Sequence, residues 1–223
     1  ISGHPAMILA RARAILTPPA SVILAVEEGV LRATGEARHR WLARARVQAP
    51  GISGVTRLDE AGVTDLDAEA LTRQVREIEA VKIFFEIGEA TPRPDQETVL
   101  DWLAWRIQAL AFQVHDVEAA AKVVLRGRTD PTGSLRFNLK LGQQRAATVC
   151  SALIQRGVPR EMLQVAEEAA VSPEATMDVI PSESDYALYR SVSFVIVLSS
   201  KSPLVEPAGG GVPGDGGGGM ARP

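Results

Sequence analysis

The sequence predicts a mixed α/β (α+β) fold built from two folded units. The chain has 223 residues, enough for one large or two small domains, and 46% of them are hydrophobic, which is ordinary for a globular protein. Short β-rich runs alternate with longer segments of helical periodicity along most of the chain. A charged segment at 61–80 interrupts this alternation, so we expect an α-β-β-α-β unit before it and a β-α-β-α-β-β unit after it.

The first unit is expected over residues 1–60. Its predicted elements are a helix at 6–16, a hairpin of strands at 22–26 and 30–34, a helix at 38–48 and a short strand at 55–58. Pro5 precedes the first helix and Pro18-Pro19 ends it, while Glu27-Glu28-Gly29 supplies the hairpin turn.

Residues 61–80 are expected to form a helical connector. Asp67 is a plausible N-cap, and Leu71, Val75 and Ile78 form an apolar stripe at helical spacing. The segment suits a rigid spacer helix between the two units.

The second unit is expected over residues 81–199, as a small mixed sheet with helices over one face. Its predicted elements are strands at 81–85, 121–125, 162–168 and 192–198, helices at 95–114 and 135–156, and a polar loop at 171–186. Residues 200–223 are rich in Gly and Pro with little to bury, so we expect a disordered tail.

Charge and composition exclude several classes of function. The net charge of -3 and pI near 5.7 argue against a general nucleic-acid binder, and the basic run Arg38–Arg46 suits a solvated helix face. No apolar run is long enough to span a bilayer, and no signal peptide opens the chain. We expect any export signal or membrane anchor to lie upstream of these residues.

No pattern of catalysis, metal binding or cofactor binding is found. Cys150 is the one cysteine and lies in an apolar helical stretch, which indicates a buried structural thiol. His4, His39 and His115 stand in no catalytic or metal-binding spacing, and we expect the last two to be exposed. We therefore expect a protein that is not an enzyme and that uses no metal or cofactor.

The informative stretch is 125–146, LRGRTDPTGSLRFNLKLGQQRA. A strand ends near Gly127, a turn follows, and a helix begins after Ser134. Asp130 then lies at the edge of a sheet, and Arg145 lies about three turns into the helix. The return of this helix could bring the two side chains to one cleft. By residue type alone, Asp130 could equally organise an Asx turn or cap the helix, with Arg145 as its surface ion-pair partner.

This stretch resembles the OmpA-like domain, whose motif is G-H-T-D-x-x-G-s…N-x-x-L-S-x-x-R-A. The residues that match in order are Gly127, Thr129, Asp130, Gly133, Ser134, Asn138, Leu141, Arg145 and Ala146. Gly157-Val158-Pro159 and the last apolar strand match further on, so the resemblance covers roughly residues 81–199.

The resemblance implies binding to the peptide stem of peptidoglycan through diaminopimelate. Arg145 would bind the carboxylate of this zwitterion, because a guanidinium fork suits a carboxylate, and Asp130 would accept hydrogen bonds from its ammonium group. Asn138 and the main chain around Thr129 would frame the cleft. The chain would then be a non-catalytic envelope protein that tethers a component of the envelope to the cell wall.

Three departures from the motif affect this expectation. Arg128 replaces the usual His and adds a cation at the site, and Gly142 replaces a Ser. The late N-R-R-V motif appears as Tyr189-Arg190-Ser191-Val192. The alternative is therefore a scaffold subunit of a membrane-associated assembly that keeps the fold but has lost peptidoglycan binding.

The first unit resembles a BON domain. The resemblance rests on the hairpin Val26–Gly35, the helix after it, and Gly54-Val55-Thr56 at the start of the last strand. A generic small α/β domain is the alternative. BON domains imply contacts with phospholipid or protein, so other envelope proteins are possible partners. Together the two resemblances imply the periplasm or cell envelope, including the outer membrane, of a Gram-negative bacterium.

Overall fold

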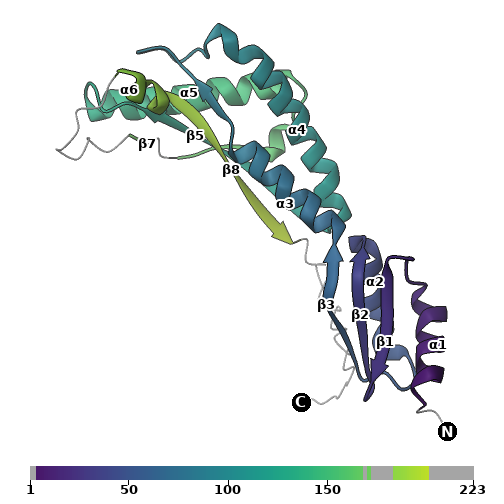
Figure 1. Ribbon diagram of the computed structural model, residues 1–223. Coiled ribbons are helices and arrows are strands. Elements are labelled where there is room, and N and C mark those ends of the chain that lie inside the picture. Colours follow the sequence, from purple (N-terminus) through teal and green to yellow (C-terminus); the bar gives the residue numbers. More distant parts are fainter. Residues whose placement is uncertain (1–3, 168–169, 172–182, 201–223) are drawn as a thin grey trace, which may run out of the picture.

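The computed structural model describes residues 4–167, 170–171 and 183–200, and it contains two sheets, each with its own hydrophobic core (Figure 1). The mixed α/β class predicted from the sequence is confirmed. Residues 201–223 of the predicted tail (200–223) and most of the predicted polar loop lie outside the described residues, and residue 200 is the last residue of a strand.

The first unit has the predicted order of elements. Its elements are α1 (Pro5–Leu16), β1 (Val22–Glu27), β2 (Val30–Ala37), α2 (His39–Gln48), a 3-10 turn (Ala49–Gly51) and β3 (Arg57–Asp65). β1 and β2 form the antiparallel hairpin, and β3 adds in parallel on the other side of β2. Trp41 closes the core, where its indole Nε1 donates to the carbonyl of Leu16 at 2.9 Å. β3 is longer than predicted, because it continues through residues assigned to the connector.

The connector differs from its prediction at its start. β3 passes without a loop into α3 (Leu66–Glu79), and the N-cap is Asp65, whose carboxylate accepts from the amides of Asp67 and Ala68. Asp67 instead accepts from the amide of His39, at 2.9 Å. His39 is also not exposed as predicted, since its Nδ1 lies 2.7 Å from Asp65 and its side chain is only 18% exposed.

α3 packs into the core of the second unit. Leu71 and Ile78 are buried there and Val75 packs against them, so the predicted stripe is the contact face. The carboxylate of Glu79 also accepts from the amide of Ile196 on β8, at 2.8 Å. The helix thus does more than separate the two units. We propose the domain limits 1–60, 61–80, 81–199 and 200–223 as a working division of the chain.

The second sheet has the strand order β4-β8-β5-β6, with a short β7 beside the end of β5. Its strands are β4 (Lys82–Phe84), β5 (Ala119–Thr129), β6 (Leu163–Val165), β7 (Ala170–Val171) and β8 (Ser191–Ser200). The connecting helices are α4 (Glu97–Asp116), α5 (Leu135–Gln155) and α6 (Glu183–Tyr189), with 3-10 turns at Pro94–Gln96 and Arg160–Met162. α6 lies where the sequence predicted polar loop.

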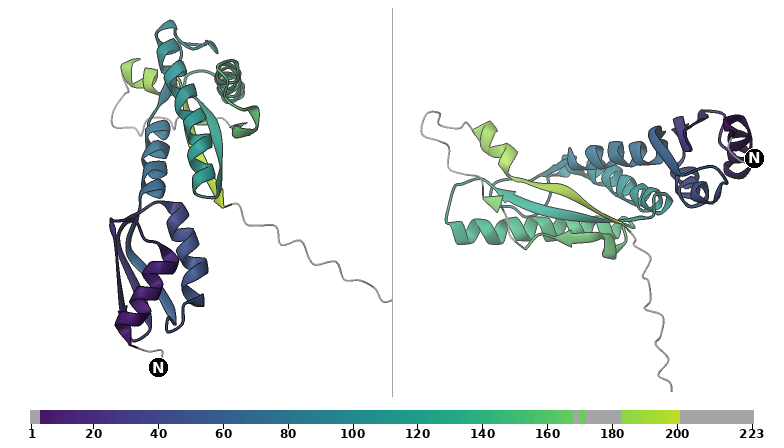
Figure 2. Two further views of the ribbon diagram at one scale, coloured as in Figure 1. Left: turned by 90° about the vertical axis from the view of Figure 1, so that its right-hand side faces the viewer. Right: turned by 90° about the horizontal axis from the view of Figure 1, so that it is seen from below.

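The helices α3, α4 and α5 share one core with one face of this sheet (Figure 2). Along β5, residues 121, 123, 125, 127 and 129 are buried in alternation with more exposed ones, which is the period of a strand covered on one side. Cys150 of α5 is buried as predicted, and burial raises the pKa of its thiol while Arg160 opposes the shift.

Gly127 lets α5 lie directly on β5. A Cβ at Gly127 would lie 1.7 Å from the carbonyl oxygen of Gly142, a distance that no side chain can occupy. Gly142, which departs from the family motif, is itself buried at this contact. The two glycines therefore fix how closely the helix approaches the strand just before the turn that carries Asp130.

We expect Gly127→Ala to lower the free energy of unfolding of the second unit by more than about 3 kcal/mol, because the new methyl group must push helix and strand apart. Gly51→Ala is the control, since a Cβ there meets nothing within 4 Å. Denaturant unfolding followed by circular dichroism measures both. A Gly127→Ala protein as stable as the parent would contradict this account of the contact.

Candidate ligand-binding site

The candidate site lies on the turn between β5 and α5, which we call the site turn (residues 130–134). Ser134 caps α5 by accepting from the amide of Phe137 at 3.3 Å. Asn138, one turn into the helix, is buried and donates from Nδ2 to the carbonyls of Asp130 and Thr132, at 3.1 and 2.9 Å. Asn138 therefore fixes the shape of the turn from below.

Asp130 is 7% exposed, and both of its carboxylate oxygens are bonded within the protein. Oδ1 accepts from the amide of Thr132 at 3.1 Å and from the Thr132 hydroxyl, which makes an Asx turn. Oδ2 accepts from Nη1 of Arg190 at 3.2 Å. An ionised carboxylate offers about four acceptor positions, so Asp130 can accept one further hydrogen bond.

Arg145 is fully buried beneath the site turn, and its guanidinium donates to three main-chain carbonyls. Nη1 donates to Arg128 at 3.0 Å, Nη2 to Glu86 at 3.0 Å and Nε to Glu89 at 2.8 Å. The guanidinium also lies 5.0 Å from the centre of the Phe85 ring. A surface ion pair with Asp130, one alternative from the sequence, is therefore not what the structure shows.

Arg145 joins three separate segments of the chain. Besides α5 and the end of β5, it holds the segment after β4, which we call the β4 loop (residues 85–93). Burial lowers the pKa of Arg145 to about 10, and Arg190 adds to the shift while the charge of Asp130 opposes it. The side chain stays charged at neutral pH. The charges of Asp130 and Arg145 attract each other, but no direct hydrogen bond joins the two side chains.

Arg190 is a member of the site that the sequence reasoning did not include. It lies just before β8, is 6% exposed and reaches Asp130. The antiparallel register pairs Gly127 with Val192, which brings residue 190 level with the end of β5, beside the site turn. The sequence does contain an indication of this role, because Arg190 is the arginine that the altered Tyr189–Val192 motif retains. Its position beside Asp130, however, depends on a strand register that the sequence does not specify.

Two neighbouring groups keep polar atoms without a partner among the described residues. Thr129 is 2% exposed, and its hydroxyl has no hydrogen-bond partner there. Arg128 is half-buried, and its Nε is buried without a partner in the same part of the chain. Arg128 and Thr129 are the last two residues of β5, so their side chains leave the strand on opposite sides, and Asp130 follows directly after it. All five residues selected from the sequence thus lie at or beneath one turn.

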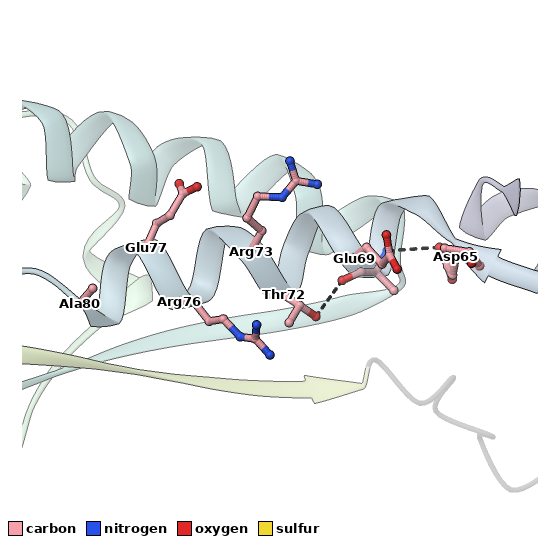
Figure 3. Close-up of a pocket in the computed structure, with 9 residues that line it drawn as sticks. Asp65, Glu69, Thr72, Arg73, Arg76, Glu77 and Ala80 are labelled. Carbon is pink, nitrogen blue, oxygen red and sulfur yellow. Dashed lines mark hydrogen bonds between the residues drawn. The ribbon is translucent and has the colours of Figure 1, made fainter.

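A hollow of about 820 Å³ runs along α3, apart from the site turn (Figure 3). Its lining is mostly the exposed face of this helix, where Arg73 and Arg76 point to different sides. Asp65 already caps α3, and Glu77 forms an ion pair with Arg106. Two of its acidic side chains thus already have partners, and the residues that line it form no arrangement of nucleophile, acid and base.

The described ranges contain no group of three or more His, Cys, Asp or Glu side chains that could hold a metal ion. In the same ranges, no helix combines the length and the apolar character needed to cross a bilayer.

Residues 84–184 match the model of the OmpA family, within the range 81–199 that the motif predicted. The chain therefore contains an OmpA-like domain. It is 27% identical over 118 residues to "Outer membrane protein A" of Bordetella avium, covering 53% of this chain and 55% of that protein. It is 33% identical over 75 residues to "Peptidoglycan-associated lipoprotein" of Legionella pneumophila, covering 34% and 41%. The matches thus span about half or less of these relatives, which are proteins of the bacterial envelope.

The chain is also similar to solved structures. The peptidoglycan-associated lipoprotein of Burkholderia pseudomallei has a TM-score of 0.41 at 21% identity, covering 52% of this chain and 89% of that one. The C-terminal domain of Helicobacter pylori MotB has a TM-score of 0.40 at 21% identity, covering 52% and 83%.

We expect Arg145→Ala to lower the free energy of unfolding by about 3 kcal/mol or more, because three carbonyls lose their donor, at about 1–3 kcal/mol for each buried group. Arg145→Lys should recover only part of the loss, since an ammonium cannot reach three separated acceptors.

Arg93→Ala is the control for this measurement. Arg93 is an arginine of the β4 loop whose partners Asp95 and Glu86 are exposed, so its removal should change stability far less than Arg145→Ala does. Equal losses in Arg145→Ala and Arg93→Ala would show that the three main-chain bonds contribute little.

Proposed function

We propose that the chain is a non-catalytic protein of the Gram-negative periplasm whose OmpA-like domain binds the diaminopimelate-containing peptide of peptidoglycan. In this proposal it tethers an envelope component to the cell wall. The match to the OmpA family supports the proposal, as does the similarity to a relative named as peptidoglycan-associated. The first unit, which we propose to be BON-like, would contact other envelope proteins.

The observation that carries the proposal is the fixed carboxylate of Asp130. Thr132 and Arg190 hold it in one orientation, so little conformational entropy is lost when a ligand binds. One acceptor position remains, which suits the ammonium group of a zwitterionic amino acid. Hydrogen bonds to a charged group contribute about 1.5–3 kcal/mol each, which is enough to orient a small ligand.

The carboxylate of the ligand would be bound by Arg128, which lies two residues before Asp130 and whose Nε has no partner among the described residues. Thr129, whose side chain leaves the strand on the opposite side, would contribute to the site through its main chain. Arg145 would act mainly by positioning other groups, since its guanidinium already holds the main chain at the end of β5 and in the β4 loop. Its buried positive charge still favours an anionic group nearby.

One observation favours a second candidate, a scaffold that keeps the fold without binding peptidoglycan. Asp130 and Arg145 are both bonded inside the protein, and such bonds stabilise a fold whether or not a ligand is present. A scaffold subunit of a membrane-associated assembly would need no more than this.

Co-sedimentation with purified peptidoglycan separates the two candidates. We expect the protein to sediment with diaminopimelate-type peptidoglycan, and Asp130→Asn to weaken binding by about 10-fold to 150-fold, because it removes one charged hydrogen bond. Asparagine keeps the acceptor of the Asx turn but loses the ion pair with Arg190, so circular dichroism is used to check that the variant is folded before binding is compared. Asp101→Asn is the control, because Asp101 is an exposed carboxylate on α4 that pairs with Arg156.

Peptidoglycan that contains lysine in place of diaminopimelate lacks the terminal carboxylate and should bind more weakly. If the parent protein fails to sediment with either type, the binding proposal is wrong and the scaffold stands.

Binding should also weaken as ionic strength rises. The Debye length falls from about 10 Å at 0.1 M salt to about 3 Å at 1 M, which screens contacts between partly exposed charges. Affinity is measured at several salt concentrations for the parent protein and for Asp101→Asn. An affinity that does not change with salt would argue against Asp130 and Arg128 as direct contacts.

A further inference from the structure

α4 is apolar on its outer face as well as on its inner one. Inward, Leu103, Ile107 and Leu110 are fully buried. Outward, Trp105 is 61% exposed and Phe112 is 77% exposed. Two of the three tryptophans of the chain lie on this helix. Because soluble proteins seldom leave neighbouring large aromatic side chains in water, this face suits a protein interface.

The neighbouring helices define the two sides of this face. Toward α3, Arg106 pairs with Glu77, and its guanidinium lies 5.8 and 5.5 Å from the rings of Trp102 and Trp105. Toward α5, Asp101 accepts from Nε of Arg156 at 2.7 Å. Trp105, Ala109 and Phe112 follow each other at helical spacing between these sides, and we call them the α4 stripe.

We propose that the α4 stripe binds the same stripe of a second copy of this chain, with the two helices antiparallel about a two-fold axis near Gln108 and Ala109. Trp105 and Phe112 lie on either side of Ala109, so this symmetry places each Trp105 against the Phe112 of the other copy. The small side chain of Ala109 lets the helices approach closely at the axis. A pattern of large, small and large residues is self-complementary, as a two-fold interface requires.

Charge complementarity supports the same arrangement. Asp101 and His115 are exposed and lie 14 residues apart on the side of α4 that faces α5. Their midpoint is Gln108, so the two-fold axis that pairs the aromatic rings also places each Asp101 opposite the His115 of the other copy. The Asp101 carboxylate can accept from a ring N–H of histidine in either protonation state.

The charges near the stripe favour a protein over a lipid surface. The exposed acidic residues Glu97, Asp101 and Asp116 lie along the same helix, and an anionic bilayer would repel them. Each of the two aromatic side chains of the stripe buries about 150–250 Å² when fully covered. Together they supply less than the roughly 800 Å² that each partner buries in a standard interface. We therefore expect a weak, reversible dimer.

A cysteine at the symmetry axis tests the geometry directly. Ala109→Cys places two thiols against each other only in the proposed dimer, and the native Cys150 is buried. Mild oxidation should convert Ala109→Cys to a covalent dimer in non-reducing gels. Ala147→Cys, at an exposed position on α5, should stay monomeric. If the two variants cross-link equally, or if Ala109→Cys does not cross-link, the proposal fails.

Sedimentation velocity over a range of protein concentrations gives an independent readout. Trp105→Glu and Phe112→Glu should each abolish dimer formation, whereas Val47→Glu, at an exposed apolar position on α2, should not. Asp101→Lys should weaken the dimer, and adding His115→Asp should restore it. A parent protein that is monomeric at every concentration, or a dimer that is indifferent to Trp105→Glu, would overturn the proposal. Because the α4 stripe is separate from the site turn, these results do not depend on peptidoglycan binding.

Discussion

The buried guanidinium of Arg145 holds the candidate site together. A charged side chain with no exposed surface is stable only when its donors are satisfied, and here three carbonyls from two segments satisfy them. Two of these carbonyls belong to the β4 loop, which is separated from Arg145 by more than 50 residues of sequence. The positions of the β4 loop and the end of β5 therefore depend on one side chain, which itself needs α5 at a fixed distance from the sheet.

That distance is set by the contact between Gly127 and Gly142. With α5 resting on the main chain of β5, Arg145 can reach the carbonyl of Arg128, and Asn138 can reach the carbonyl of Asp130. In the sequence, Gly142 is a departure from the family motif and weakens the functional expectation. In the structure it is part of the closest packing in this region. The same substitution therefore supports the geometry of the site, even though it removes a hydroxyl.

Much of the fold could be predicted from the sequence, because a helix or strand with one buried face has apolar residues at a regular spacing. The order of strands and helices in the first unit follows from it, as does that of the second unit apart from β7 and α6, and so does the buried Cys150. What failed depends on tertiary contacts. β3 extends to Asp65 because β2 pairs with it along that length, and Asp65 can cap α3 because Asp67 is bonded to His39 instead. Arg190 was missed for the same reason, since its place beside Asp130 follows from the pairing of β5 with β8.

The two units are joined where β3 passes into α3, which is also where the connector differs from its prediction. β3 and α3 are continuous, and α3 contributes Leu71 and Ile78 to the second core, so the last strand of one unit is directly joined to a core helix of the other. Polar contacts of Arg38 and His39 with Asp65 and Asp67 stabilise the junction from the side of α2. Partly exposed ion pairs of this kind contribute little individually, about 1 kcal/mol or less. The direction in which the first unit points from the site turn is therefore set mainly by the unbroken β3–α3 backbone.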